Sequence, residues 1–219
     1  EEFHELGSIP YKFRIDSEFA ELAVDKCKER GLHARTVSYY GFPIDTGSIL
    51  ALKLLNPDNR LPAIIVSSNM YANRAETIVL GKSVRDAIDV SGKKAVVVVV
   101  SALSNRLHTV EIKPEDDKIH SLKDHEWNLK FLEYLDKGRL EDVSQLSRQF
   151  HEEARVPKVV SFKPFWILAS MMGQSNLYEG NILAYEPVWG TGSAVVTMTP
   201  AEDTAGDLEY DEDDPEFYK

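Results

Sequence analysis

Small polar side chains follow three apolar stretches of the chain, and their positions make them the best candidates for chemistry. The stretches are 33–40, 61–67 and 95–100. In open α/β sheets, the loops that leave the carboxyl ends of the strands line the functional crevice. We therefore expect one crevice formed by hydroxyl, amide and carboxylate groups, namely Asp45, Thr46, Ser67, Ser68, Asn69, Ser104 and Asn105.

This crevice lacks a good proton-transfer group. Without a histidine in these loops, general acid–base work near neutral pH would fall to Asp45 alone. The spacing of His120 and His125 also differs from the i, i+4 spacing that puts two imidazoles on one helix face. Dedicated metal binding is therefore not expected from the six histidines, which are His4, His33, His108, His120, His125 and His151.

Motifs of other common sites are absent or weak. The chain has no Cys-x-x-Cys, no His-Glu-x-x-His, no Gly-x-Gly-x-x-Gly after a strand and no P-loop. Gly-Thr-Gly at 190–192 precedes a predicted strand rather than a helix, so it is a weak phosphate-binding signal. An α/β enzyme with a hydroxyl nucleophile is the least favoured alternative, because no Ser-His-Asp arrangement is visible.

Composition excludes several classes of protein. The 219 residues are 43% hydrophobic and 28% charged, as in ordinary globular proteins. Most of the net charge of −11 lies from Thr199 onward, which argues against a basic nucleic-acid surface. The single Cys27 excludes a disulfide framework and indicates a cytoplasmic protein. No run of 18 apolar residues exists, so we expect no membrane span.

The elements that must position the polar loops alternate along the first half of the chain. The stretch 95–100 is continuously apolar and includes five consecutive valines, which is typical of a central strand covered on both faces. Helices are predicted around it, and the alternation predicts an α/β fold with three α/β/α layers and a mostly parallel central sheet. The predicted helices are 18–30, 48–55 and 74–89, and the strands are the three stretches given above.

The second half changes character. Apolar spacing predicts helices at 124–137, 140–149 and 159–172, followed by two closing strands at 181–187 and 192–198. We expect a single domain over 1–198 and a solvated acidic tail over 199–219. The chain begins with Glu1 rather than Met, so we also expect residues upstream of it.

Four segments, taken together, resemble one known family. They are GFPIDTGSILALKLLNPDNRLPAIIVSSN at 41–69, AETIVLGKSVRDAI at 75–88, VVVVVSALSNRL at 96–107, and WILASMMG at 166–173 with GNILAYEPVWGTGSAVV at 180–196. Their order and spacing resemble the class III extradiol ring-cleavage dioxygenases, the family of the protocatechuate 4,5-dioxygenase β subunit. The resemblance implies a non-haem Fe(II) centre held by two His and one Glu, which activates O₂.

The same resemblance places other residues at the catalytic positions of the family. The family's Asp-His-Gly reads Asp45-Thr46-Gly47 here, the base position is Asn105, and the glutamate ligand position is Ser161. The two His ligands of the family lie in a region that precedes Glu1. Because neither Thr nor Asn can move a proton near neutral pH, we expect no catalytic residue, metal ligand or cofactor in this chain.

The resemblance and these replacements predict a non-catalytic, α-type subunit of an aminophenol or catechol dioxygenase. Such a subunit would form a hetero-oligomer with an Fe(II)-bearing catalytic subunit of the same fold, which binds the aromatic substrate. One alternative is an active Fe(II) enzyme with ligands upstream of residue 1 and a carboxylate from Glu152 or Glu153. Another is a small-molecule binding module that uses a vestigial crevice formed by Asp45, Thr46, Asn69, Ser104 and Asn105.

Overall fold

A row of helices and one long hairpin form the framework of the protein. The computed structural model describes residues 12–38, 42, 44–154, 163–174, 176 and 178–201. Its elements are α1 (Ser17–Glu29), α2 (Thr46–Leu55), α3 (Arg74–Ser91), the 3₁₀ turn η1 (Pro114–Asp116), α4 (Leu122–Asp136), α5 (Leu140–Glu153), α6 (Lys163–Met171), β1 (Tyr178–Val188) and β2 (Thr191–Pro200).

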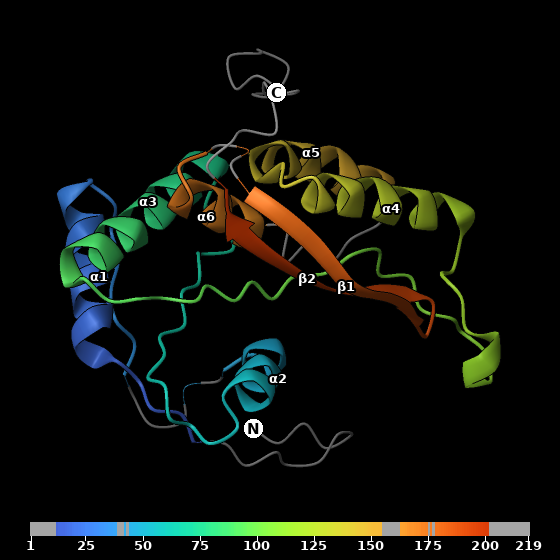
Figure 1. Cartoon of the computed structure of the whole chain (residues 1–219), viewed down its shortest axis with the longest axis horizontal. Coiled ribbons are helices and arrows are strands. Elements are labelled where there is room, and N and C mark those ends of the chain that lie inside the picture. Colours follow the sequence, from blue (N-terminus) through green and yellow to red (C-terminus); the bar gives the residue numbers. More distant parts are fainter. Residues whose placement is uncertain are drawn as a thin grey trace.

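The helices contact one another in the order α1, α3, α6, α5, α4. Figure 1 shows this row along the top of the molecule, with the hairpin β1–β2 running beneath α4 and with α2 set apart below the row. Both strands of the hairpin contact α4, so the helices and the sheet share one core.

The helix boundaries follow from capping residues in the sequence. Asp16 accepts a hydrogen bond from the Phe19 amide at 3.1 Å, and Asn73 forms a capping box with Glu76 at the start of α3. Gly92 ends α3 in a left-handed conformation with φ of 63°. The helices predicted from the sequence are confirmed within a few residues, although residues 159–162 of the last one lie outside the described part.

Aromatic side chains from three helices make the centre of the core. The Phe131 and Phe150 rings stack with centroids 4.9 Å apart, and Phe165 meets Phe131 edge-on at 5.1 Å. Phe131 and Phe150 are fully buried, and burying such a side chain contributes about 1.5–3 kcal/mol. Tyr178 and partly buried residues of the hairpin close this cluster from the other side.

The two predicted closing strands are confirmed as an antiparallel hairpin. Tyr178 pairs with Pro200 and Val188 with Thr191, with one irregularity between Ile182 and Ala184. The turn residues Trp189 and Gly190 both have positive φ, at 53° and 89°, as a type I′ hairpin turn requires.

Loop residues bind this hairpin turn from two sides. The His108 amide donates to the Trp189 carbonyl at 3.1 Å, and the His120 amide donates to the Gly190 carbonyl at 2.9 Å. The Asp117 carboxylate accepts from the amides of both turn residues. The turn is therefore held by three points of the 108–120 loop.

The predicted central sheet is not seen among the described residues. They contain helices and one two-stranded sheet, so the fold is α/β, but the stretches 33–38, 61–66 and 95–100 form no ladder with one another. A single parallel bridge joins Ile15 to Ala63. The burial predicted for 95–100 is wrong here, since Val96 is 89% exposed. Composition shows that a stretch is apolar but does not show which other segment covers it.

Two other features bear on the sequence predictions. No helix of the described part is both long and apolar enough to cross a bilayer.

Cys27 is buried and free. Burial raises the pKa of its thiol, and a hydrogen bond with Ser83 lowers it. A buried thiol with a raised pKa is a poor nucleophile, so Cys27 packs as a small apolar side chain. The tail from residue 202 lies outside the described residues.

Candidate functional site

A polar groove lies where the chain leaves the 95–100 stretch. Residues 101–105 form one wall, and Val188 with residues 191–193 of the hairpin forms the other, enclosing about 250 Å³. The Gly192 amide donates to the Ser104 carbonyl at 3.2 Å, which joins the two walls. A Cβ at Gly192 would lie 2.5 Å from the Asn128 amide nitrogen, so glycine allows this close approach.

A buried hydrogen-bond network supports the groove from behind. Asn128 accepts from the Ser104 amide at 2.9 Å and donates to the Ser104 hydroxyl at 2.7 Å. Its amide nitrogen also donates to the Tyr185 hydroxyl at 3.1 Å. The Tyr185 oxygen lies 3.0 Å from Nδ1 of His125. The network therefore runs from the groove through α4 to β1.

The chemistry of this network is neutral hydrogen bonding. Burial raises the pKa of the Tyr185 hydroxyl, and the hydrogen bond from Asn128 lowers it. The net direction is upward, so Tyr185 keeps its proton at neutral pH and can donate it to His125. Asn128 and Ser104 do not titrate in the physiological range. Consequently, the Ser104 side of the groove can position a polar ligand but offers no base of its own.

An ion pair also fixes the loop to α4. Arg106 Nε lies 3.3 Å from Oδ2 of Asp124, and the Asp124 side chain is only 1% exposed. Removing one partner of a buried pair leaves an uncompensated charge. The pair therefore joins Arg106, the residue after the groove wall, to α4.

The loop before α2 lies near the same end of the 95–100 stretch. The Asp45 carboxylate caps α2 by accepting from the Ser48 amide at 2.8 Å, and Thr46 is the exposed first residue of that helix. At Gly47 a Cβ would lie 2.6 Å from Cγ1 of Val100. This loop therefore lies at the end of the 95–100 stretch, but Asp45 and Thr46 do not line the groove.

Asn69 is held elsewhere. Its side chain accepts from the Tyr71 amide at 2.9 Å, and its carbonyl accepts from Lys163 Nζ at 2.9 Å. Lys163 also binds the Met70 carbonyl at 2.6 Å, and burial lowers the pKa of this amine. Of the seven residues predicted for the crevice, the groove thus brings together Ser104 and Asn105, and Ser67 and Ser68 do not line it.

The residues behind the groove were not predicted from the sequence. Asn128 and Tyr185 are separated by 57 positions in the chain, so no local motif links them. One signal was available, because Asn128 lies on the same buried face of α4 as Phe131, Leu132 and Leu135. A polar residue in such a stripe needs a partner.

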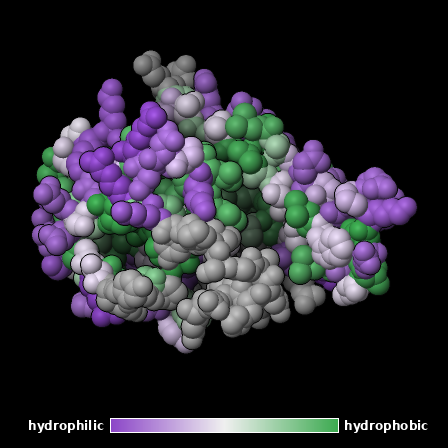
Figure 2. All heavy atoms as spheres, turned by 90° about the horizontal axis from the view of Figure 1, so that it is seen from below, coloured by the Kyte–Doolittle hydropathy of each residue, from purple (hydrophilic) through white to green (hydrophobic). Residues whose placement is uncertain are grey.

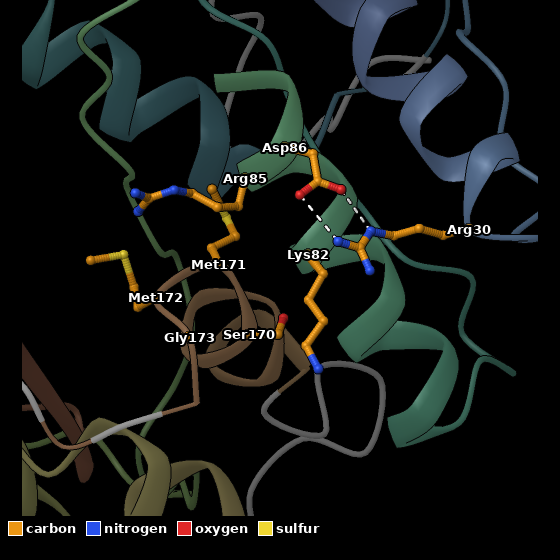
Figure 3. Close-up of a pocket in the computed structure, with 8 residues that line it drawn as sticks. All are labelled: Arg30, Lys82, Arg85, Asp86, Ser170, Met171, Met172 and Gly173. Carbon is orange, nitrogen blue, oxygen red and sulfur yellow. Dashed lines mark hydrogen bonds and ion pairs between the residues drawn. The ribbon is translucent and has the colours of Figure 1, made fainter. Parts of the chain in front are cut away.

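A second hollow, of about 330 Å³, lies at the junction of α1, α3 and α6. Arg30 makes a two-point contact with Asp86 at 2.7 and 3.1 Å, which lowers the pKa of Asp86. Figure 3 shows the charged ends of Lys82 and Arg85 pointing in different directions rather than toward a common centre. This hollow is therefore a helix junction stabilised by an ion pair.

The described residues do not fit an iron centre. No group of three or more His, Cys, Asp or Glu side chains among them is placed to hold a metal ion. His108 and His120 stack with ring centroids 5.4 Å apart. Asp117 Oδ1 lies 3.7 Å from His108 Nε2, and the same carboxylate accepts hydrogen bonds from the hairpin turn. Glu153 pairs with Lys123, and Ser161 lies outside the described residues.

Comparisons with known proteins identify the family. Residues 1–197 match the family described as the catalytic LigB subunit of aromatic ring-opening dioxygenase, and the chain belongs to this family. The resemblance to extradiol dioxygenases inferred from the sequence is therefore confirmed, and with it the prediction of a subunit of such an enzyme.

Two relatives come from Pseudomonas sp. The 2-aminophenol 1,6-dioxygenase alpha subunit is 30% identical over 201 residues, which cover 91% of this chain and 73% of the relative. The 2-aminophenol 1,6-dioxygenase beta subunit is 33% identical over 205 residues, which cover 89% of this chain and 66% of the relative. The chain is thus similar to both kinds of subunit, and it spans less than two thirds of the second.

Proposed function

We propose that this chain is a non-catalytic, α-type subunit of an extradiol dioxygenase that opens an aminophenol or catechol ring. The proposal rests on the chemistry of Thr46 and Asn105, which the resemblance places at the family's histidine and base positions. Thr46 begins α2 and Asn105 lines the groove, and neither side chain can accept a proton from a ring hydroxyl near neutral pH.

The network behind Ser104, the neighbour of Asn105, supports the proposal. His125, which meets the network behind the groove, is separated from Ser104 by Asn128 and Tyr185. Its Nδ1 is engaged with the Tyr185 hydroxyl at 3.0 Å. Substrate deprotonation therefore falls to a catalytic partner, which we propose also holds the Fe(II) and binds the aromatic substrate.

Exposed apolar side chains support a partner subunit of the same fold. Leu54 and Leu55 on α2 are 78% and 66% exposed, and Val96 is 89% exposed. Figure 2 shows hydrophobic side chains gathered in the middle of the face seen from the side of α2, where the surface is hollowed. Exposed apolar surface of this kind marks contacts with other proteins. We propose that the catalytic subunit covers it.

The same surface bears on the fold. The stretches 33–38, 61–66 and 95–100 form no helix and no ladder with one another in the described part, and one parallel bridge joins Ile15 to Ala63. We propose that these stretches belong to the mostly parallel central sheet of a three-layer fold in the assembled protein. A cytoplasmic location, inferred from Cys27, stays a prediction.

Iron and activity measurements test the proposed function. The chain would be purified alone and after co-expression with a catalytic subunit of the same fold, and each subunit would be assayed for iron and for cleavage of 2-aminophenol and catechol. We expect co-purification, with iron and turnover assigned to the partner. Stoichiometric iron and turnover in this chain alone would overturn the proposal.

Variants of two carboxylates separate the proposal from an active enzyme. In the co-purified complex, Glu152→Gln and Glu153→Gln should leave iron content and turnover unchanged, because Glu152 is exposed and Glu153 pairs with Lys123. Loss of iron in either variant would instead identify that residue as a ligand. Glu126→Gln, an exposed change on α4, is the matched control.

A further inference from the structure

The turn over residues 69–72, just before α3, has a fixed shape. The Asn69 carbonyl accepts from the Ala72 amide at 3.0 Å, and the Asn69 side chain accepts from the Tyr71 amide at 2.9 Å. An Asn side chain that binds the backbone two residues further on is a common way to set a turn. These bonds are local, so they fix the shape of the turn but not its place on the molecule.

Lys163 at the start of α6 fixes the place of the turn. Its Nζ donates to the Asn69 carbonyl at 2.9 Å and to the Met70 carbonyl at 2.6 Å. Lys163 is buried, and burial lowers the pKa of its amine while the charge of Glu76 raises it. Burying an ammonium group is costly unless the group is hydrogen-bonded. The protein meets this cost by using the Lys163 hydrogens on the backbone of the turn.

The chain that follows the turn is also held. Asn73 forms the capping box with Glu76 at the start of α3. Arg74 Nη2 lies 3.0 Å from the Glu141 carboxylate and 3.2 Å from the Ser144 hydroxyl, both on α5. The turn is thus attached to α6 on one side and to α3 and α5 on the other. Its backbone therefore has little freedom to lose when a partner binds.

Two large side chains project from this fixed turn. Tyr71 is 86% exposed and Met70 is 61% exposed. Tyrosine is enriched among the residues that dominate binding energy at interfaces, and methionine adapts to irregular apolar surfaces. A tyrosine with two side-chain torsions, on a backbone already fixed, binds at a low cost in conformational entropy. The 69–72 turn therefore has the properties of an interface anchor.

Further exposed apolar side chains connect the turn to α2. Leu54 and Leu55 lie at the end of α2, and Leu61 and Ile65 follow before Met70. Figure 1 shows this part of the chain rising from α2 to the row of helices. The turn thus continues the α2 surface, which we proposed above as the contact with the catalytic subunit. A stable interface buries about 800 Å² on each partner, which is more than the few leucines of α2 can supply.

We propose that Met70 and Tyr71 form an anchor that inserts into an apolar socket of the catalytic subunit, and that Lys163 is the positioning residue that presents this anchor. The identity of the partner rests on the proposed function. The Tyr71 ring supplies apolar contact, and its hydroxyl binds a polar group in the socket. Lys163 is buried behind the turn, so it acts through the turn rather than by touching the partner.

The dissociation constant of the purified complex with the catalytic subunit, measured by calorimetry, tests the anchor. Tyr71→Ala should raise this constant by about thirtyfold or more, the loss typical of a residue that dominates an interface. Tyr71→Phe keeps the ring and removes one hydrogen bond, so it should raise the constant by about fivefold. Val90→Ala is the matched control, because Val90 is exposed at the opposite end of α3, and it should change nothing.

Lys163→Met separates a positioning role from a general structural one. Methionine has a long unbranched side chain but cannot donate to the two carbonyls. We expect this change to weaken association about fivefold to tenfold in the unmodified background and to have little further effect in the Tyr71→Ala background, because the two residues act as one unit. Circular dichroism shows whether each variant folds. Tyr71→Ala alters only an exposed side chain, so the anchor is tested even where Lys163→Met does not fold.

Three results would overturn the proposal in different ways. Equal association by Tyr71→Ala and by the unmodified chain would overturn the anchor and leave the proposed function in place. Equal losses from Lys163→Met with and without Tyr71 would overturn the positioning role of Lys163. Failure of the unmodified chain to associate with the catalytic subunit would refute the proposed function, and the anchor with it.

Discussion

Replacing Asn128 with alanine removes the residue on which the groove's network depends. Asn128 is fully buried and makes three hydrogen bonds, to the Ser104 amide, the Ser104 hydroxyl and the Tyr185 hydroxyl. Each net hydrogen bond contributes about 1 kcal/mol, and a buried group left unpaired costs somewhat more. Tyr185 keeps His125 as a partner, so the Ser104 groups bear most of the loss. We expect Asn128→Ala to lower the free energy of unfolding by about 3 kcal/mol.

Urea unfolding followed by circular dichroism measures this loss. Asn181→Ala is the matched control, because Asn181 is exposed on β1 and its change should be within about 0.5 kcal/mol of wild type. Tyr185→Phe should cost about 1 kcal/mol, and the double variant should cost less than the sum because the two residues share a hydrogen bond. A loss below about 1 kcal/mol for Asn128→Ala, or strict additivity in the double variant, would refute the network.

Three further changes test other parts of the structure. Gly192→Ala places a Cβ 2.5 Å from the Asn128 amide nitrogen and should destabilise by about 1–3 kcal/mol, whereas Ser193→Ala next to it should be neutral in the same unfolding assay. Asp86→Asn should reduce the fall of the unfolding free energy as the pH is lowered. The folded-state pKa of Asp86 is lowered by Arg30, so the stabilisation is present above the unfolded pKa of about 3.9 and is lost as pH falls through the folded value. Because the side chains of Arg30 and Asp86 are 40% and 36% exposed, solvent screening should keep the effect below about 1 kcal/mol. Equal acid sensitivity of the variant and wild type would contradict it. Leu54→Asp on α2, where Leu54 is 78% exposed, should reduce co-purification with the catalytic subunit, while Leu122→Asp, where Leu122 is 72% exposed on α4, should not; loss in both variants or in neither would argue against α2 as the partner surface.

Local signals in the sequence were sufficient to locate the helices. Asp16 and Asn73 cap helices because their side chains accept the free amides of the first turn, and Gly92 permits the left-handed turn that ends α3. Such contacts lie within a few residues of one another. The boundaries of α1 and α3 could therefore be predicted without knowing what the helices contact.

Long-range relations were harder to predict. The valines of 95–100 indicated a central strand covered on both faces, yet Val96 is exposed. The burial of a strand depends on which other segments pack against it, and the composition of the strand does not contain that information. Ser104 and Asn105, both expected in one crevice because they follow an apolar stretch, line the groove. Asn69 was expected beside them, but Lys163 binds the Asn69 carbonyl from 94 residues away, which is an interaction no local pattern reveals.

The two-sided attachment of the hairpin turn has a consequence for how the chain can be rebuilt. The amides of His108 and His120 bind the adjacent turn residues Trp189 and Gly190, so the intervening segment leaves the body and returns to the same point. Residues 113–116 at its tip are exposed. Exposed tips whose ends are tied together tolerate cleavage and insertion. New chain termini, or an inserted reporter domain, can therefore be placed at 113–116 while both flanking segments remain fastened to the hairpin.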